Sequence, residues 1–284
     1  MSVPSFGDLG KKARDVLRTG YTYDRAKVKF SKPFFDIGFE CDTYVDLKSF
    51  KLGISGLTNY NIEKYGKFNV KLSTDGPVVI EYNCNGIINE NVDIVAGYSI
   101  NLMDSFQSCK LASKFHNSLL NTTFSLTKDF DRNVDLLGSL VLKSNNYLIG
   151  YQSGFDTNTS QITKNNAAFA INQNNLILHL RCIQIPKEFG LSAFYTVNDK
   201  LNIAMDTKMA SNEERSLWYL TAGFSYKLVD DCKLQMKIDK NLQLGSNMLF
   251  HLKDNLLLTI ACNLDLGNPK SGQHRIGLGL NIGP

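Results

Sequence analysis

Most of this chain alternates between apolar and polar residues with a period of two, the pattern of a β-strand that has two different faces. The clearest runs lie at 68–72, 94–102, 218–228, 234–238 and 276–282. In each run one set of alternate positions is apolar, and the other set is rich in Lys, Asn, Ser, Thr and Gly. From about residue 27 onward, the pattern therefore predicts an all-β chain whose strands have one apolar face and one wet face.

Short polar segments separate these runs, for example at 73–77, 198–200, 253–255 and 270–273. Such segments are typical of tight hairpins, and no helical period is long enough for a crossover, so we expect an antiparallel sheet throughout. At about 9–11 residues per membrane strand and about 3–4 per turn, the chain holds roughly 18–20 strands. In lipid a sheet of this width must close, because open edges would leave backbone amides unpaired. A closed barrel of this size has an aqueous lumen.

Alternation alone also fits a soluble β-barrel or sandwich that carries a small ligand, because such strands have one buried and one wet face. Two features favour the membrane barrel. The alternating runs recur along the chain without a linker, and the chain has only six prolines. From the pattern alone, the soluble ligand carrier remains an alternative.

The first residues follow a helical period instead, over 5–20. The apolar side of the predicted helix carries Phe6, Leu9, Ala13, Val16 and Leu17. The opposite side carries Asp8, Lys11, Lys12, Arg14, Asp15 and Arg18. Gly20 follows as a stop signal. So short a helix is marginal in water and needs a wall for its apolar stripe. We therefore divide the chain into a helix and linker at 1–24 and a barrel at 25–284.

Composition narrows the class of protein further. Hydrophobic residues are 43% of the chain, the mean hydropathy is −0.17, and the longest apolar stretches, such as 256–262, are short. A helical membrane protein needs about 18–20 apolar residues per span and is excluded. The net charge of +4 without any long Lys/Arg run suits attraction of anions and gives no nucleic-acid patch.

The sequence contains no motif for metal binding or catalysis. The six cysteines form no CxxC pair, so we expect no metal site and interpret the cysteines as reduced wall residues. The four histidines are isolated, and no nucleophile motif occurs, so we expect no enzyme activity. Charges at Asp8, Lys11 and Lys12 exclude a cleavable signal peptide. We therefore expect synthesis in the cytosol and insertion into an organelle membrane.

Both ends of the chain carry specific motifs. The segment at 3–16, VPSFGDLGKKARDV, closely resembles the N-terminus of the voltage-dependent anion channels, which are the eukaryotic mitochondrial porins. The segment at 272–282, GQHRIGLGLNI, resembles their last strand. Between these, the segments at 63–66, 148–152 and 188–190 resemble further landmarks of that family.

The resemblance implies a barrel of about 19 strands whose first and last strands pair in parallel, with the helix inside the lumen. It implies a voltage-gated, weakly anion-selective pore of the mitochondrial outer membrane that passes small anions, metabolites and nucleotides. Its partners would be membrane lipid, other copies of the pore and docking proteins of that membrane. We expect the helix to pack on the wall through Leu9, Ala13, Val16 and Leu17, and to line the pore with Asp8, Lys11, Arg14 and Asp15.

The resemblance also implies weak ATP or NADH binding. The matching positions are Lys11, Gln243, Leu244, Gly245, Ala261, Cys262, Asn263, Leu264 and Asp265. This chain departs from the family pattern at Thr19, which replaces a second helix lysine, and at Gln243 and 262–263. As plain residues, these two C-terminal segments fit ordinary wall strands equally well.

Two further features concern the two ends of the barrel. The last strand matches a mitochondrial sorting signal at Arg275, Gly277, Leu280 and Ile282. The linker has Tyr21 and Tyr23 where the family has glycines, which predicts a stiff hinge.

A protein-import channel of similar architecture is an alternative function. The short head and the slight positive charge oppose it, because such a channel needs acidic tracks for basic presequences.

Overall fold

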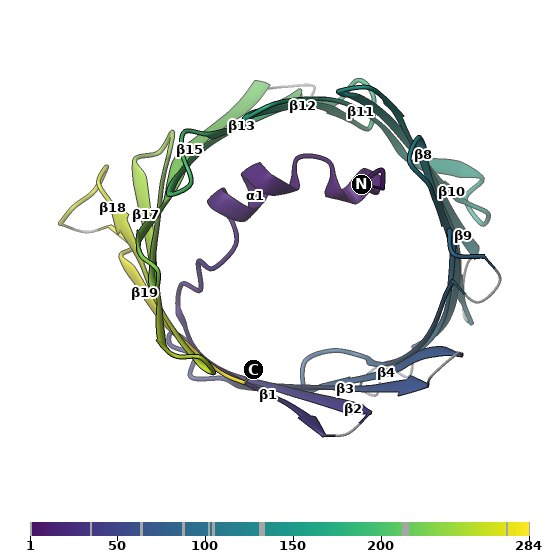
Figure 1. The fold of residues 1–284 in the computed structure, drawn as a ribbon, viewed down its shortest axis with the longest axis horizontal. Helices are drawn as coiled ribbons and strands as arrows, with labels where there is room; N and C mark the ends of the chain where they lie inside the picture. The colour runs from purple at the N-terminus through teal and green to yellow at the C-terminus, as the bar shows by residue number, and fades with distance from the viewer. Residues whose placement is uncertain are drawn as a thin grey trace.

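The computed structural model shows one closed sheet of 19 strands that surrounds the N-terminal segment (Figure 1). It describes residues 2–34, 36–62, 65–86, 89–101, 103, 106–130, 134–211, 216–270 and 272–283. The strands are β1 (Arg25–Phe34), β2 (Ile37–Asp46), β3 (Leu52–Ile62), β4 (Gly66–Ser73), β5 (Val78–Asn85), β6 (Val92–Ile100), β7 (Gln107–His116), β8 (Leu120–Asp129), β9 (Val134–Ser144), β10 (Tyr147–Asp156), β11 (Gln161–Gln173), β12 (Leu176–Ile183), β13 (Glu188–Thr196), β14 (Leu201–Ser211), β15 (Ser216–Val229), β16 (Cys232–Asp239), β17 (Gln243–Lys253), β18 (Leu256–Asp265) and β19 (Arg275–Ile282). The predicted barrel is confirmed.

Each strand pairs with its neighbours in the chain, and β1 pairs with β19 to close the sheet. Every pair is antiparallel except β1 with β19, which is parallel with Val28 opposite Leu280. The expectation of an antiparallel sheet throughout is therefore wrong at this one pair. Hairpins reverse the strand direction at each step, so an odd number of strands brings the first and the last together in the same direction.

The register assigns each strand residue to the lumen or to the lipid. On β15, Trp218 and Phe224 lie on the outer face, while Thr221 and Ser225 face the lumen. The wall has large exposed apolar side chains outside, such as Ile276 at 60% exposure. Such a surface is stable in hydrocarbon and costly in water. The barrel is a transmembrane barrel.

The predicted turns lie where strands end, as at Ser73 before β5 and at Lys253 before β18. Two residues of the sequence pattern, Leu102 and Ser271, lie outside the described residues, as do Glu63 and Lys64 of one family landmark. All six cysteines are free. None of the helices that the structure describes has the length and apolarity needed to cross a bilayer.

The N-terminal segment lies inside the ring of strands (Figure 1). It comprises a 3-10 turn, η1 (Phe6–Asp8), and a short helix, α1 (Lys11–Leu17). The prediction of one helix over 5–20 is therefore wrong in extent. Gly10 has φ +71, a left-handed conformation that interrupts the helix, and a Cβ there would overlap His179 Nδ1 on the wall. At this break, the backbone of the segment lies close to the wall.

Candidate functional site

The N-terminal segment packs on one sector of the luminal wall, which we call the covered wall. Its buried apolar residues are Val141, Leu148, Ala168, Ala170, Phe194 and Ala204, from β9 to β14. Leu9 lies in one apolar cluster with part of this set, and Ala13, Val16 and Leu17 lie in a second cluster with the rest. The structure thus buries all the residues that the sequence analysis assigned to helix packing. A fully buried Val or Leu contributes about 1.5–3 kcal/mol, so this contact holds the segment firmly.

Small wall residues permit this close contact. A Cβ at Gly150 would lie 2.9 Å from Phe6 Cδ2 and 3.0 Å from Leu9 Cδ1. A Cβ at Gly223 would lie 2.9 Å from Leu17 Cδ2 and 2.5 Å from the Met236 carbonyl oxygen on the neighbouring strand β16. Larger residues at these positions would lift the segment off the wall.

The first residues of the chain form an anchor that the sequence analysis did not predict. Val3 is only 2% exposed and packs with Leu9 against the wall. Its backbone nitrogen donates to Asn117 O at 3.2 Å, and Asn121 Nδ2 donates to Val3 O at 2.8 Å. The helical pattern begins at residue 5, so it gave no reason to place this lone apolar residue on the wall.

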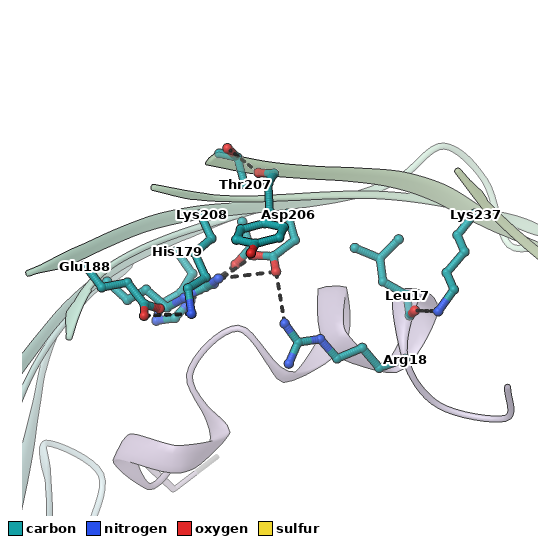
Figure 2. A network of polar contacts seen from close by, with 11 residues as sticks. Leu17, Arg18, His179, Glu188, Asp206, Thr207, Lys208 and Lys237 are labelled. Atoms are coloured by element: carbon teal, nitrogen blue, oxygen red, sulfur yellow. Dashed lines mark hydrogen bonds and ion pairs between the residues drawn. The ribbon is translucent and has the colours of Figure 1, made fainter. Parts of the chain in front are cut away.

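The C-terminal end of α1 is held by polar side chains that donate to its free carbonyl groups. Lys237 Nζ on β16 donates to Leu17 O at 2.8 Å (Figure 2). Tyr21 Oη donates to Val16 O at 3.3 Å. The Lys237 ammonium also lies 4.0 Å from the ring centroid of Tyr21, a cation–π contact. Burial raises the pKa of the Tyr21 phenol, so it stays a neutral donor. These bonds satisfy carbonyls that a helix end leaves unpaired.

An ion-pair junction on the wall continues this attachment (Figure 2). Asp206 on β14 accepts bonds from Arg181 at 2.8 and 3.2 Å, and Arg18, which follows α1, lies 3.3 Å from the same carboxylate. Lys208 Nζ on the same strand lies 2.6 Å from Glu188 Oε2. The Asp206 side chain is 13% exposed and the Arg18 side chain is 65% exposed. The ion pair between them therefore adds little to the free energy of docking, and its main effect is to orient the end of α1.

The residues predicted to line the pore lie on the free side of the segment. Asp8, Lys11 and Asp15 are exposed to the lumen. Arg14 is half-buried, and its guanidinium donates to the Gly7 carbonyl, so it joins α1 to η1. Lys12 Nζ lies 5.6 Å from the Phe194 ring centroid. The segment therefore presents a mixed charged surface to the water column.

A second sector, which we call the bare wall, comprises β1 to β5. Its luminal face has ion pairs, with Lys27 Nζ at 3.1 Å from Asp42 and Lys29 Nζ at 2.7 Å from Glu40. A polar hollow of about 620 Å³ lies over it. The hollow is lined by Glu40, Leu57, Asn59, Lys67, Asn69, Lys71, Val79 and Glu81. The lysines Lys67 and Lys71 add positive charge to this side of the lumen.

A polar cavity of about 850 Å³ lies beside the linker. It is lined by Leu17, Arg18, Tyr23, Asp206, Thr221, Lys237, Asp239, Gln243, Gly245, Asn263, Asp265, Asn268, Gly272, Gln273 and Arg275. It includes Gln243, Gly245, Asn263 and Asp265 from the residues predicted to bind nucleotide. Lys11 does not line it.

The remaining predicted nucleotide residues do not reach this cavity. Leu244, Cys262 and Leu264 alternate with luminal residues in the register and so lie on the lipid-facing side, which corrects their assignment. Ala261 is luminal but 0% exposed. Arg18, Lys237 and Arg275 also line the cavity and were not predicted there, because their common position depends on the barrel register and on where α1 docks. Within the described ranges, no group of His, Cys, Asp and Glu could hold a metal ion.

The residues assigned to the sorting signal alternate in the same way. Arg275 and Gly277 face the lumen, while Leu280 and Ile282 face the lipid. Arg275 Nε lies 3.6 Å from Asp24 Oδ2 at the start of the barrel.

Comparison with known proteins identifies the fold. The sequence profile of the eukaryotic porins matches residues 2–277 of this chain. The chain belongs to the eukaryotic porin family. It is 30% identical over 291 residues to the voltage-dependent anion-selective channel of Drosophila melanogaster, with 99% of each chain covered. It is 26% identical over 282 residues to the non-selective voltage-gated ion channel VDAC1 of Homo sapiens, with 98% of each chain covered.

These findings confirm the predicted family and the predicted class of function. The porin is a voltage-dependent anion pore, and it lets ions and metabolites cross a membrane. The soluble ligand carrier and the import channel are not favoured.

Proposed function

We propose that this porin is a weakly anion-selective pore of the mitochondrial outer membrane, and that its docked N-terminal segment sets the selectivity. The observation that carries this is the charged free side of α1, which stands in the lumen while the apolar side is buried on the covered wall. Cations held in a narrow section raise the local concentration of anions through their summed field. Small anions, metabolites and nucleotides are the proposed cargo.

Neutralising Lys11 and Arg14 together tests this proposal. Lys11→Gln with Arg14→Gln is expected to lower the anion-to-cation permeability ratio, measured as the reversal potential in a salt gradient across a planar bilayer. Lys128→Gln is the matched control, since the register puts this lysine at the rim on the outer face. An unchanged reversal potential in the double variant would contradict the assignment.

The two relatives named above have different printed descriptions, one anion-selective and one non-selective. For this chain, the luminal lysines of the bare wall support a slight anion preference. Lys27 and Lys29 are paired with acids, so their charges are largely balanced. Lys67 and Lys71 have no such pair among the ion pairs of the described residues. Glu81 lines the same hollow, so the two lysines leave an excess of one positive charge there, which favours anions on the side opposite the helix.

Weak binding of ATP or NADH in the polar cavity is a second part of the proposal. Arg18, Lys237 and Arg275 line this cavity and supply cations for phosphate, while Asp206, Asp239 and Asp265 in the same lining oppose an anion and keep the binding weak. The buried Asn263 Oδ1 has no hydrogen-bond partner within the described part of the chain and could accept from an adenine amino group or a ribose hydroxyl. Asn263→Leu is expected to weaken NADH binding in a fluorescence titration of the refolded porin. Equal affinity of the wild type and the variant for NADH would contradict NADH binding in this cavity.

The other finer assignments are proposals that rest on the family. We propose that the chain acts as a channel and catalyses no reaction, and that Arg275, Gly277, Leu280 and Ile282 serve as its sorting signal. Association with other copies of the pore, or with docking proteins, stays a prediction. Import into isolated mitochondria followed by carbonate extraction tests the location. Failure of the chain to enter the carbonate-resistant fraction of the outer membrane would contradict it.

A further inference from the structure

The linker crosses the inside of the wall at the seam where the barrel closes (Figure 1). At this point the Asp24 backbone nitrogen donates to Ile276 O on β19 at 3.0 Å. The Asp24 carbonyl accepts from the Leu47 backbone nitrogen, after β2, at 2.8 Å. One linker residue therefore connects the last strand to the β2–β3 turn. The seam it spans is the single parallel pair of the barrel.

The side chain of Asp24 strengthens this connection. Its carboxylate lies 3.0 Å from Lys48 Nζ and 3.6 Å from Arg275 Nε, and the side chain is 20% exposed. The backbone of Asp24 has φ +58, a left-handed conformation that turns the chain from the linker into β1. Charge and backbone geometry both fix the point at which the linker leaves the wall.

Gly277 on β19 is the position that the linker touches most closely. A Cβ at Gly277 would overlap the Thr22 carbonyl oxygen, and it would lie 2.6 Å from the Thr22 carbonyl carbon and 3.2 Å from the Arg25 carbonyl oxygen. All these atoms are backbone, so a side chain at this position could be accommodated only if the linker moved away.

Gly279 shows that this closeness is specific. It lies two residues further along β19 and on the same luminal face. A Cβ there would lie 3.3 Å from Thr259 Cβ and 3.8 Å from Thr259 Oγ1, which are atoms of the neighbouring strand. No linker atom lies within contact distance of that Cβ, so Gly279 is a matched control.

We propose that Gly277 is a positioning residue for the N-terminal segment: its bare Cα receives the linker at Thr22, and Asp24 fastens the linker there across the seam. The C-terminal end of the segment is thereby attached at a fixed point on the wall. This role is separate from any part that Gly277 plays in a sorting signal. It can be tested in protein refolded without import machinery.

The test compares wild type, Gly277→Ala and Gly279→Ala, each refolded as the full chain. Hydrogen exchange of the Asp24 amide is the direct readout, because this amide is protected by its bond to Ile276 O. Gly277→Ala is expected to exchange at least about tenfold faster there, and Gly279→Ala within about twofold of wild type. The Leu278 and Leu280 amides on β19 should keep their protection in both variants. The conductance–voltage curve should shift in Gly277→Ala alone.

Three results would overturn the proposal. They are wild-type exchange at Asp24 in Gly277→Ala, equal acceleration in both alanine variants, and a loss of protection along β19 equal to that at Asp24. If Gly277→Ala does not refold, Asp24→Asn provides the second test. It leaves β19 unchanged and removes both ion pairs, so the Asp24 amide should exchange about threefold faster or more. Unchanged exchange in Asp24→Asn would overturn the proposal as well.

Discussion

The covered wall and the bare wall are built from strands of the same kind, and they differ only on the luminal face. Outside, both sectors have exposed apolar residues, such as Phe39 on β2 and Phe169 on β11. Inside, the covered wall has Ala168, Ala170 and Ala204, all buried under the N-terminal segment. The bare wall has Lys29 paired with Glu40. The residues of the luminal face therefore differ according to whether the N-terminal segment covers them.

The difference has a simple physical origin. Small and apolar residues let the segment approach closely and exclude water, whereas charged residues keep their hydration when nothing covers them. A segment placed on the bare wall would bury ion pairs such as Lys27 with Asp42 at a cost in desolvation. The covered wall also has an ion pair, Arg181 with Asp206, but there Arg18 of the segment joins it. Wall composition thus favours the covered wall over the bare wall.

A charge placed under the helix should have the largest effect. Ala204 is 1% exposed beneath α1, so Ala204→Arg forces a buried charge against Ala13 and Leu17. Release of the segment is expected, at a cost of about 3 kcal/mol or more in docking free energy, or about a hundredfold. The measurement is the rate of trypsin cleavage after Arg18 in the refolded porin.

The same substitution in the bare wall provides the control. Leu57 is half-buried on the luminal face of β3, beside the polar hollow, so Leu57→Arg can extend into water. Its cleavage rate should match that of wild type. If both variants released the segment equally, the distinction between the two walls would fail.

Removing the bond at the end of α1 should have an intermediate effect. Lys237→Gln loses the charged donor to Leu17 O and the contact with the Tyr21 ring, worth about 1.5–3 kcal/mol. The Arg18 amide, which donates to Arg14 O, should then exchange its hydrogen faster. Lys233→Gln removes the same charge from the same face of β16, where the side chain is exposed, and should leave this amide unchanged. Equal exchange in both variants would show that Lys237 does not hold the helix end.

Loosening the linker should have the smallest effect on helix docking, because Lys237 still donates to Leu17 O in this variant. Tyr21→Gly with Tyr23→Gly adds backbone freedom worth about 0.5–1 kcal/mol per residue, and it removes the tyrosine donor to Val16 O and the ring that Lys237 contacts. The voltage at which conductance falls should therefore change. Tyr65→Gly, at an exposed position before β4 in the bare wall, is the control for a tyrosine-to-glycine change away from the linker. A double variant with the wild-type conductance–voltage curve would contradict the stiff-hinge prediction.

The sequence predicted much of the fold because its main signals are local. Alternation predicted the strands and the two faces, and the stripe of Leu9, Ala13, Val16 and Leu17 predicted which side of the helix meets a wall. The strand number and the parallel closure came from the family resemblance, since counting residues gave only a range. The break at Gly10 was missed because its cause, contact with His179, joins residues that are far apart in the chain.

The candidate site was less predictable than the fold. Lys237 and Asp206 look like any other polar residue in an alternating strand, and only the register places them at the helix end. Leu264 was assigned to a nucleotide site by similarity of position, yet alternation alone puts it on the opposite face from Asn263. A check of each carried-over residue against the period-two pattern would have found this error.

The most direct test of the account is a planar-bilayer recording of the refolded full-length chain, with a salt gradient and stepped voltage. We expect discrete pores that shift to a lower conductance under voltage and reverse at a potential that favours anions. Insertion without any conductance, or a conductance independent of voltage with a reversal potential favouring cations, would contradict it.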